Sequence, residues 1–362
     1  MALEFGSWAP VCGGWLRTRD ANKKPSPAEL VRLARHVERL GYDYYYVPEH
    51  YLNAIHGPGE DVLDAWVVSA AAVSGTRRLR VITAVQPGFK APGVVAKMGA
   101  TLAGFRRGAF GLSLLAGWWQ LEVENHADVW LPHAERYARA GEYLDVIRGF
   151  WEEPVLDYRG QYFTIRGGLL EPKPDPVPPV IIAGESERAI DLAARAGDYL
   201  FINGGDVEQV ASLVSKAKGR ARERGRSLKV ALSAFGVVRS SSAEARAVVD
   251  GLRERADAAT IGYFRQHMDG AVVAHNRGAE ADTLEANLGL SSGLIGDPAS
   301  IIERIEQLER AGVDAITVKC EPAFDESERF SRLVISPYRA AHPPAGGGSR
   351  RPSPAPTAPE SV

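Results

Sequence analysis

One segment of the sequence combines a strand end, a glycine and a helix start in the way that anion sites require. Residues 181–201 read IIAGESERAIDLAARAGDYLF, and the apolar run gives way to a helical pattern at Ala183-Gly184-Glu185-Ser186. The free N–H groups and the positive dipole end of a helix that begins there would bind a phosphate, and the Ser186 hydroxyl would add a hydrogen bond. Ordinary N-capping by Ser186 explains the same pattern equally well, and Glu185 would repel a phosphate if its side chain pointed inward. Both interpretations stay open at this point.

A second segment places aromatic and basic side chains after another strand. The apolar run at 110–115 ends at Ala-Gly, and the consecutive pair Trp118-Trp119 follows. A polar loop comes next, and a helix is expected from His133, with Arg136 and Tyr137 in its first turn. Paired indoles at a strand end suit a flat aromatic ligand. An arginine is a good phosphate or carboxylate binder, although a solvated helix face is the alternative explanation for Arg136.

Other side chains of chemical interest follow the remaining apolar runs. Glu49 and His50 are candidates for an acid or a base, and a salt-bridged pair at a strand end is the alternative explanation. The other strand-end residues are Trp8, Cys12, Gln86, Ser113, Asn203, Phe235, Lys319 and Cys320. The sequence contains no His-x-His or His-Glu-x-x-His pair, so metal catalysis has little support, and no Gly-x-Ser-x-Gly elbow of a hydrolase. Strand ends that are rich in aromatic residues favour a flat bound cofactor that carries out the reaction itself.

The elements that must position these residues alternate between short apolar runs and amphipathic helical patterns. Asp297, Pro298 and Gly312 mark the start and the end of one such helix. Eight runs with helices between them predict a TIM (β/α)8 barrel, whose chemistry lies where strands end. The predicted strands are 3–9, 42–47, 79–85, 110–115, 180–183, 199–202, 228–238 and 315–318. The first and eighth strands are neighbours in a closed barrel, yet we expect Cys12 and Cys320 to be two unrelated buried thiols.

Three segments depart from this alternation of apolar runs and helical patterns. Residues 152–168 alternate like a small hairpin outside the barrel, after the fourth barrel helix. Residues 257–294 lack a clean period and are expected to be a mobile lid or insertion after the seventh strand. The Pro/Gly/Ser-rich tail at 341–362 is expected to be disordered, so 1–340 form a single predicted domain.

The composition and charge further narrow the class of protein that this chain represents. The chain has 362 residues, a formal net charge of −2 with both signs interspersed, and two cysteines. No apolar run is long enough to span a membrane, and the start of the chain does not resemble a secretory signal. The charge gives no case for a nucleic-acid partner, and the low cysteine content fits a reducing cytoplasm.

Several motifs together identify a family resemblance over about residues 5–338. The most specific are VITAVQPG with VAKMGATL, AGWWQLE, WLPHAERYARAGEYLDVIRGFW, GQYFTI, PPVIIAGESERAIDLAA and LIGDPASIIERIEQLERAGVD. The chain resembles the bacterial luciferase-like, two-component flavin monooxygenases, above all the dimethyl sulfone type, with alkanesulfonate and pyrimidine monooxygenases as near relatives. The resemblance implies a TIM barrel with a lid, reduced FMN from a separate NAD(P)H:flavin reductase, O2 as co-substrate and a flavin peroxide as oxidant. It also implies a homodimer or homotetramer.

The resemblance also suggests roles for individual residues. Ser113, Trp118, Glu49 and His50 are expected in catalysis, and Trp118 is expected beside the isoalloxazine ring. The expected FMN-binding residues are Gln86, Ser113, Glu122, Arg136, Tyr137, Ala183, Gly184 and Ser186. Trp8, Cys12 and Phe235 are expected to face substrate. Trp119 is expected to point elsewhere, into packing or toward a partner subunit.

The chain departs from its relatives at positions that matter for the substrate. Ser113 stands where relatives typically carry Asn, and Ser233 and Phe235 stand where alkanesulfonate enzymes have Arg and His. A sulfonate would then lack that clamp, so a small neutral or weakly polar substrate is expected, with C–S or C–N cleavage or hydroxylation. The alternatives are an F420-dependent oxidoreductase of the same superfamily and a non-catalytic flavin-binding relative.

Overall fold

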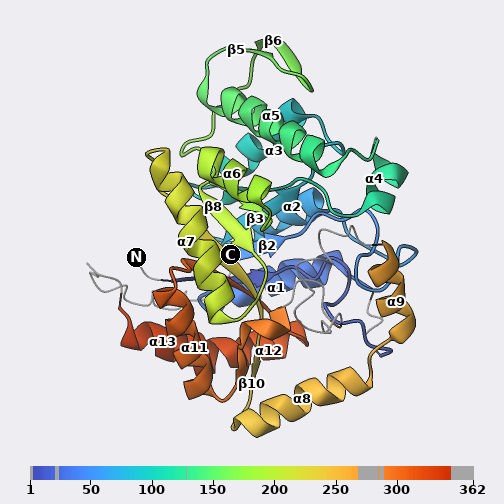
Figure 1. Cartoon of the computed structure of the whole chain (residues 1–362), viewed down its shortest axis with the longest axis vertical. Coiled ribbons are helices and arrows are strands. Elements are labelled where there is room, and N and C mark those ends of the chain that lie inside the picture. The colour runs from blue at the N-terminus through green and yellow to red at the C-terminus, as the bar shows by residue number, and fades with distance from the viewer. Residues whose placement is uncertain (1–2, 21–23, 128, 268–283, 285–288, 344–362) are drawn as a thin grey trace, which may run out of the picture.

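Eight parallel strands close into a barrel in the order β1-β12-β9-β8-β7-β4-β3-β2, with helices around it (Figure 1). The computed structural model describes residues 3–20, 24–127, 129–267, 284 and 289–343. The barrel strands are β1 (Glu4–Trp8), β2 (Tyr44–Val47), β3 (Arg80–Val85), β4 (Phe110–Leu115), β7 (Val180–Ala183), β8 (Tyr199–Ile202), β9 (Lys229–Phe235) and β12 (Ala315–Lys319). The predicted TIM barrel and its eight strands are confirmed.

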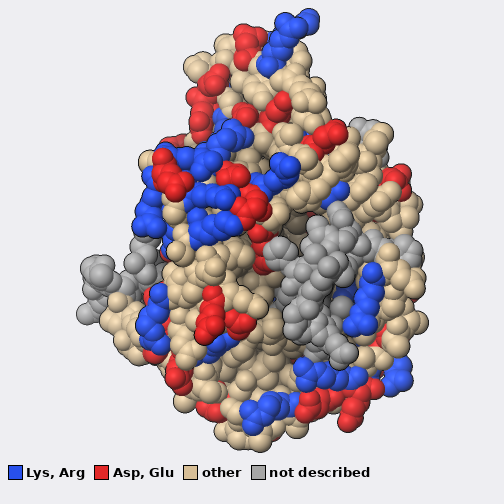
Figure 2. Space-filling model, viewed as in Figure 1, with Lys and Arg blue, Asp and Glu red and all other residues tan. Residues whose placement is uncertain are grey.

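The helices begin and end where their capping residues indicate. Asp297 accepts a hydrogen bond from the Ser300 amide at 3.0 Å, Pro298 starts the helix, and Gly312 follows its end with φ of 94°. The ring consists of α1 (Pro27–Arg39), α2 (Ala65–Gly75), α3 (Pro92–Ala103), α5 (His133–Glu152), α6 (Glu187–Ala196), α7 (Val207–Glu223), α8 (Ser242–Glu254), α11 (Pro298–Arg310) and α12 (Ala323–Phe330). The π-helical segment η2 (Ser331–Ile335) and α13 (Ser336–Ala341) continue α12. Figure 2 shows acidic and basic side chains mixed over α6 and the neighbouring end of α7, where Glu187 pairs with Lys216 and Arg220.

Two apolar cores lie on the two faces of the strands. The outer core fills the space between strands and helices, and Phe110, Val180 and Leu200 belong to it. The inner core is aromatic and includes Trp8 and Tyr46. Because successive strand residues face opposite sides, the continuous apolar runs of the sequence supply both cores at once.

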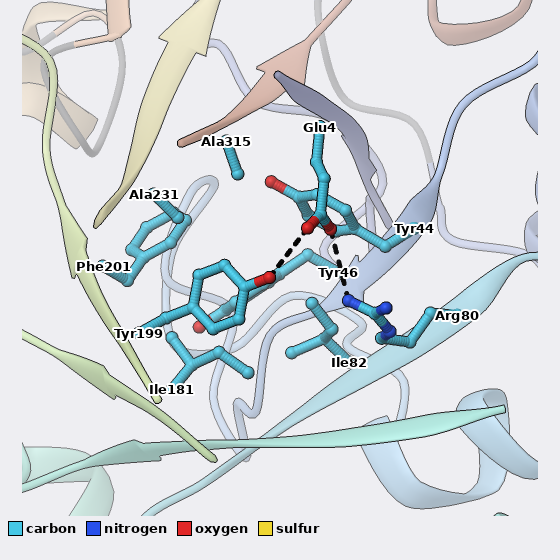
Figure 3. A pocket seen from close by; sticks show the side chains of 10 residues that line it. All are labelled: Glu4, Tyr44, Tyr46, Arg80, Ile82, Ile181, Tyr199, Phe201, Ala231 and Ala315. Carbon is cyan, nitrogen blue, oxygen red and sulfur yellow. Dashed lines mark hydrogen bonds and ion pairs between the residues drawn. The ribbon is translucent and has the colours of Figure 1, made fainter. Parts of the chain in front are cut away.

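The amino ends of the strands are filled by a polar cluster. Glu4 accepts a hydrogen bond from the Tyr199 hydroxyl at 2.8 Å and contacts Arg80 at 3.2 Å and Lys229 at 3.3 Å. Figure 3 shows Glu4 between Tyr199 and Arg80 beside a small cavity whose wall also contains Ile82. This cluster is the floor of the barrel, so the site must lie at the opposite, carboxyl end.

The seventh predicted strand is divided, which the sequence did not indicate. The barrel strand β9 ends at Phe235, and β10 (Val237–Val238) pairs instead with β11 (Ile295–Gly296). A Cβ atom on Gly236 would lie 2.8 Å from the Phe330 ring, so only glycine permits this close approach. The expected hairpin does form outside the barrel, from β5 (Leu156–Arg159) and β6 (Thr164–Gly168), which lie beyond α5 in Figure 1.

Two short helices replace expected irregular segments. The polar loop after the tryptophan pair contains α4 (Gln120–His126), and the segment 257–294 begins with α9 (Ala258–His267), where Asp257 Oδ1 accepts the amide of Ala259 at 3.0 Å. A short 3-10 helix, η1 (Gly289–Ser292), lies near the end of the same segment. Part of the expected mobile lid at 257–294, residues 268–283 and 285–288, lies outside the described residues. The expected disordered tail at 341–362 also lies outside them from residue 344, and its first residue, Ala341, ends α13. Within the described part of the chain, every helix is too short or too polar to cross a membrane.

Candidate active site

A buried carboxylate joins the loops that follow three neighbouring strands. Glu122 of α4 is fully buried, and its Oε1 accepts the amides of Tyr51 at 2.8 Å and Leu52 at 3.3 Å. His50 Nδ1 lies 3.4 Å from the same oxygen. Gln86 Nε2 donates to Oε2 at 3.2 Å. The loops after β2, β3 and β4 are therefore held together by one side chain.

Glu49 lies next to this network and has its own partners. Its Oε2 accepts the Gln86 amide at 2.7 Å, and its Oε1 accepts from Lys90 at 2.9 Å. The side chain is 4% exposed. These contacts make Glu49 a residue that positions the loops after β2 and β3. In the described contacts Glu49 pairs with Lys90 and His50 with Glu122, so the alternative of a Glu49–His50 ion pair is not formed.

Burial affects the two carboxyl groups differently because their partners differ. Burial raises the pKa of Glu49 above its ordinary value, and the opposing effect of Lys90 does not restore it. Burial also raises the pKa of Glu122, but the nearby His50 and the hydrogen bonds from the Tyr51 and Leu52 amides lower it below its ordinary value. Glu122 therefore remains an acceptor for its donors through the neutral pH range.

The two tryptophans after β4 have different surroundings. Trp119 is fully buried and its ring centroid lies 5.5 Å from that of Phe264 on α9, so it points into packing. Trp118 is partly exposed, with its ring 5.8 Å from His50 and nearly perpendicular to it. Of the pair, Trp118 is the indole available to a ligand at the mouth.

Ser113 lies inside the barrel below the mouth. It is fully buried, and its Oγ is 2.8 Å from the Tyr46 hydroxyl. Burial raises the pKa of Tyr46 to about 12, against the opposing effect of Ser113. Tyr46 therefore stays protonated at neutral pH, and one of the two hydroxyl hydrogens of the pair is left over after their mutual hydrogen bond.

The turn between β7 and α6 has the shape that a phosphate needs. Gly184 has φ of 139°, and a Cβ atom there would lie 2.8 Å from the Tyr137 hydroxyl. Ser186 is the N-cap of α6, and its Oγ accepts the Ala189 amide at 3.2 Å. N-capping and a phosphate-binding shape are thus both present. The Glu185 carboxylate accepts the amide of Asn203, which holds it toward the end of β8.

A buried arginine lies on the same side of the mouth. Arg136 is 3% exposed, donates to the Leu131 carbonyl at 3.0 Å and has its guanidinium 3.9 Å from the Trp130 ring centre. A Cβ atom on Gly117 would be 3.5 Å from Arg136 and 3.9 Å from Gln86 Oε1, so this segment brings the two side chains close. Gln86 Oε1 is a buried acceptor with no hydrogen-bond partner within the described residues. The residues on this side of the mouth are suited to bind a phosphate group and the polar edge of a ring.

The predicted substrate residues do not form one group. Trp8 and Phe235 belong to the aromatic inner core, and the Trp8 ring packs on Tyr46 at 4.4 Å. Cys12 is a free thiol in the outer core, and burial raises its pKa to about 12. Cys320 is likewise free and belongs to the outer core. The contacts therefore place Trp8 and Phe235 toward the barrel interior and Cys12 away from it.

Sequence reasoning gave no role to Lys319, which the structure brings into the aromatic core. Its Nζ lies 4.7 Å from the Trp8 ring centre and 5.3 Å from that of Trp15. A lysine at the end of the run AITVK was the available signal, because β12 faces the interior at alternate positions. Tyr46 and Trp15 were also missed, because a buried aromatic residue in an apolar run is ordinary core by pattern alone.

A closed barrel with a phosphate-type turn after β7 and an aromatic mouth defines a class of barrel enzymes that use phosphate-bearing cofactors. The chain belongs to the luciferase-like monooxygenase family, whose sequence profile matches residues 3–315. It is 30% identical over 344 residues to the FMNH2-dependent dimethylsulfone monooxygenase of Pseudomonas putida, covering 92% of this chain and 94% of the relative.

Solved structures share the fold at lower identity. The EDTA monooxygenase from Chelativorans sp. BNC1 superposes with a TM-score of 0.79 at 20% identity, covering 94% of each chain. An F420-dependent secondary alcohol dehydrogenase superposes with a TM-score of 0.71 at 21% identity, covering 93% of this chain and 99% of its own. The family resemblance inferred from the sequence is confirmed.

The opposite pKa shifts at the mouth predict opposite effects of two isosteric variants on acid stability. The lowered pKa of Glu122 contributes stability above its ordinary value of 4.5, and this is lost as the pH falls below that value. The raised pKa of Glu49 gives a contribution that declines as the pH rises from 4.5 through the folded-state pKa. Glu122→Gln should remove the loss on acidification, and Glu49→Gln should remove the decline on alkalinisation.

Urea unfolding at pH values on both sides of 4.5 measures these slopes. The control is Glu223→Gln, at an exposed position near the end of α7, which should leave both slopes unchanged. Equal slopes in the two mouth variants would contradict the assigned shifts.

Proposed function

We propose that the protein is an FMNH2- and O2-dependent monooxygenase that oxygenates a small organic substrate. The observation that carries the proposal is the Gly184–Ser186 turn, which faces the Tyr137 hydroxyl at the edge of an aromatic mouth. Family membership and the 30% identity to an FMNH2-dependent enzyme support the same function.

The residues at the mouth divide the binding of FMN between them. The Ala183–Ser186 turn, Tyr137 and Arg136 would hold the phosphate, because backbone N–H groups, hydroxyls and a guanidinium all donate to it. Gln86 would offer its buried Oε1 to a ring N–H, and Trp118 would lie beside the ring. Reduced FMN, when bound, supplies the electrons that activate O2.

The remaining residues would prepare the barrel interior for oxygen transfer. The Ser113–Tyr46 pair presents a protonated hydroxyl at the base of the mouth, where it would hold a proton for an oxygen atom that gains charge. Trp8 and Phe235 would exclude water and face the substrate. Glu122, His50 and Glu49 would keep the loops in place, with His50 beside Trp118.

A separate NAD(P)H:flavin reductase would supply the reduced flavin to this chain. The relative's printed FMNH2 dependence supports such a partner, because reduced FMN must be produced elsewhere. We also infer a cytoplasmic location, where reduced flavin and NAD(P)H are available and where the free thiols of Cys12 and Cys320 are stable.

Substrate-dependent oxygen consumption tests the proposed function. The protein is incubated with FMN, a flavin reductase, NADH and O2 across a panel of small sulfur- and nitrogen-containing compounds, with the reductase alone as control. We expect oxygenated product only when protein and FMN are both present. Anaerobic turnover with reduced F420, and none with FMNH2, would decide for the oxidoreductase alternative. FMN binding without any turnover would decide for the non-catalytic one.

Loss of the Ser186 hydroxyl should weaken FMN binding specifically. Ser186→Ala removes a hydrogen bond to a charged phosphate, worth about 1.5–3 kcal/mol, so the Kd for FMN should rise about 10- to 150-fold. Flavin fluorescence titration measures it.

A matched control separates phosphate binding from helix capping. Ser241→Ala removes the equivalent cap of α8, where Ser241 Oγ accepts the Glu244 amide at 3.2 Å. Both variants should lose about 1 kcal/mol of stability, and only Ser186→Ala should lose FMN affinity. Equal FMN affinities in the two variants would remove Ser186 from the site.

The chain is also proposed to form a homo-oligomer through α2 and α3. The outward-facing Val67 of α2 is 71% exposed and Val94 of α3 is 52% exposed, and Phe105 beyond α3 is 55% exposed. The sequence of α2 contains no charged residue. A helix that is apolar on all sides is normally buried, which supports an interface between copies here.

Charges on these helices should separate the subunits. Val67→Lys combined with Val94→Lys is expected to convert an oligomer into a monomer, as measured by light scattering after gel filtration. Leu169→Lys is the control, because Leu169 is 73% exposed but follows the outer hairpin. A monomeric wild type, or an oligomer that survives the double variant, would contradict this interface.

A further inference from the structure

A third apolar cluster lies beside the mouth, apart from the two cores of the barrel. Its buried members are Ala54 of the loop after β2, Trp119 of the segment after β4 and Phe264 of α9. Four partly buried side chains pack against them: Leu52, Trp118, Leu121 and Tyr263. The cluster therefore joins α9, which follows β9 and α8 in the chain, to the loops that carry His50 and Trp118.

Main-chain hydrogen bonds attach the start of α9 to the loop after β1. The Asp257 amide donates to the Arg17 carbonyl at 2.9 Å, and the Arg19 amide donates to the Arg255 carbonyl at 2.9 Å. An antiparallel bridge lies between these two contacts. The first turn of α9 is therefore held by the backbone of another mouth loop, in addition to the packing of its side chains.

Phe264 is the buried side chain that α9 contributes to the cluster. It is 1% exposed, its ring centroid lies 5.5 Å from that of Trp119, and the Arg17 guanidinium lies 4.4 Å from its ring centre. Arg17 is itself buried and donates to the Ala54 carbonyl at 2.9 Å. A cation over a ring face and an indole beside the ring both favour one position of that ring.

Ring packing carries this position from Phe264 to Trp118. Trp119 Nε1 is buried and has no hydrogen-bond partner within the described residues, so the neighbouring rings determine where the indole of Trp119 lies. The Trp118 ring stacks on Trp119, with centroids 5.7 Å apart and 28° between the planes. Because aromatic pairs have preferred geometries, a displacement of Trp119 would also displace Trp118.

We propose that Phe264 is a positioning residue for the flavin site: through Trp119 it fixes the orientation of Trp118, the indole available to a ligand at the mouth. This deepens the proposed monooxygenase function and rests on it for the flavin, although the position of Trp118 can be measured without one. No contact with flavin or substrate is assigned to Phe264. Because coupling between two equilibria is reciprocal, docking of α9 should favour FMN binding, and bound FMN should favour docking.

Fluorine NMR of the flavin-free protein tests the positioning step. The protein is labelled with fluorotryptophan, and Trp118→Phe identifies the Trp118 resonance among those of the seven tryptophans. Phe264→Leu keeps an apolar side chain but removes the ring, so it should shift or broaden the Trp118 resonance. Phe264→Met should act in the same way, which keeps the test decisive if Phe264→Leu folds poorly.

Titration with FMN tests the consequence for the cofactor. Phe264→Leu should raise the Kd for FMN about three- to tenfold, within the range of interaction energies between contacting side chains. In a Trp118→Ala background the same substitution should leave the Kd unchanged, because the indole through which it acts is missing. Combined with Ser186→Ala, which acts on the phosphate, it should still raise the Kd by the same factor.

Phe110→Leu is the matched control for lost packing. Phe110 is also 1% exposed, and its ring lies 5.9 Å from the indole of Trp66, but in the outer core. This variant should lower the stability and shift the Trp66 resonance. It should leave both the Trp118 resonance and the Kd for FMN unchanged.

The outcomes separate this proposal from the proposed function. A Trp118 resonance that is unchanged in folded Phe264→Leu and Phe264→Met overturns the positioning role. An FMN affinity that is unchanged, that falls equally in Phe110→Leu, or that falls as much in the Trp118→Ala background also overturns it. A wild type that binds no FMN would overturn the monooxygenase proposal, while the Trp118 resonance would still decide whether Phe264 positions the indole.

Discussion

The arrangement of the mouth depends on the buried carboxylate of Glu122. Its two oxygens accept from the loops after β2 and β3 while the residue itself belongs to the segment after β4. A carboxylate can accept several hydrogen bonds at once, and a buried one is stable only when they are made. The same constraint brings His50 to Trp118 and directs Gln86 toward Gly117. Three loops that would otherwise move independently therefore present their side chains as one surface.

Around this surface, different strands of the barrel contribute side chains of different chemistry. The turn after β7 and the start of α5 provide donors suited to a phosphate, whereas β1, β9 and β12 contribute Trp8, Phe235 and Lys319 to the aromatic interior. Ser113 and Tyr46 lie between them, below the mouth. A ligand with a phosphate at one end and a reactive ring at the other would be held at that turn by its inert end. Membership of the luciferase-like monooxygenase family agrees with a phosphate-binding side of the mouth.

Local signals predicted much of this structure, and long-range contacts account for what they missed. Continuous apolar runs located all eight strands, and Asp297, Pro298 and Gly312 marked their helix correctly, because both depend on neighbouring residues. The strand breaks at Gly236, which the Phe330 ring approaches closely, and no local pattern contains this long-range contact. The helix α4 was missed because its seven polar-rich residues show no period.

Local sequence signals were limited in the same way at the candidate site. The turn at Gly184 and Ser186 was visible as a glycine and a cap at a strand end, and the structure adds the Tyr137 hydroxyl that faces it. Glu49 and His50 looked like a pair because they are adjacent, yet each contacts a different carboxylate or cation supplied by a distant segment. The position of Lys319 beside the indoles of Trp8 and Trp15 required the closure of the barrel, which makes the first and last strands neighbours. The polar floor also determines from which end of the barrel a ligand enters. Because Glu4, Tyr199 and Lys229 fill the amino end, they leave the carboxyl end as the entrance for a ligand of the barrel interior. A cofactor and a substrate bound in the interior would then share that entrance.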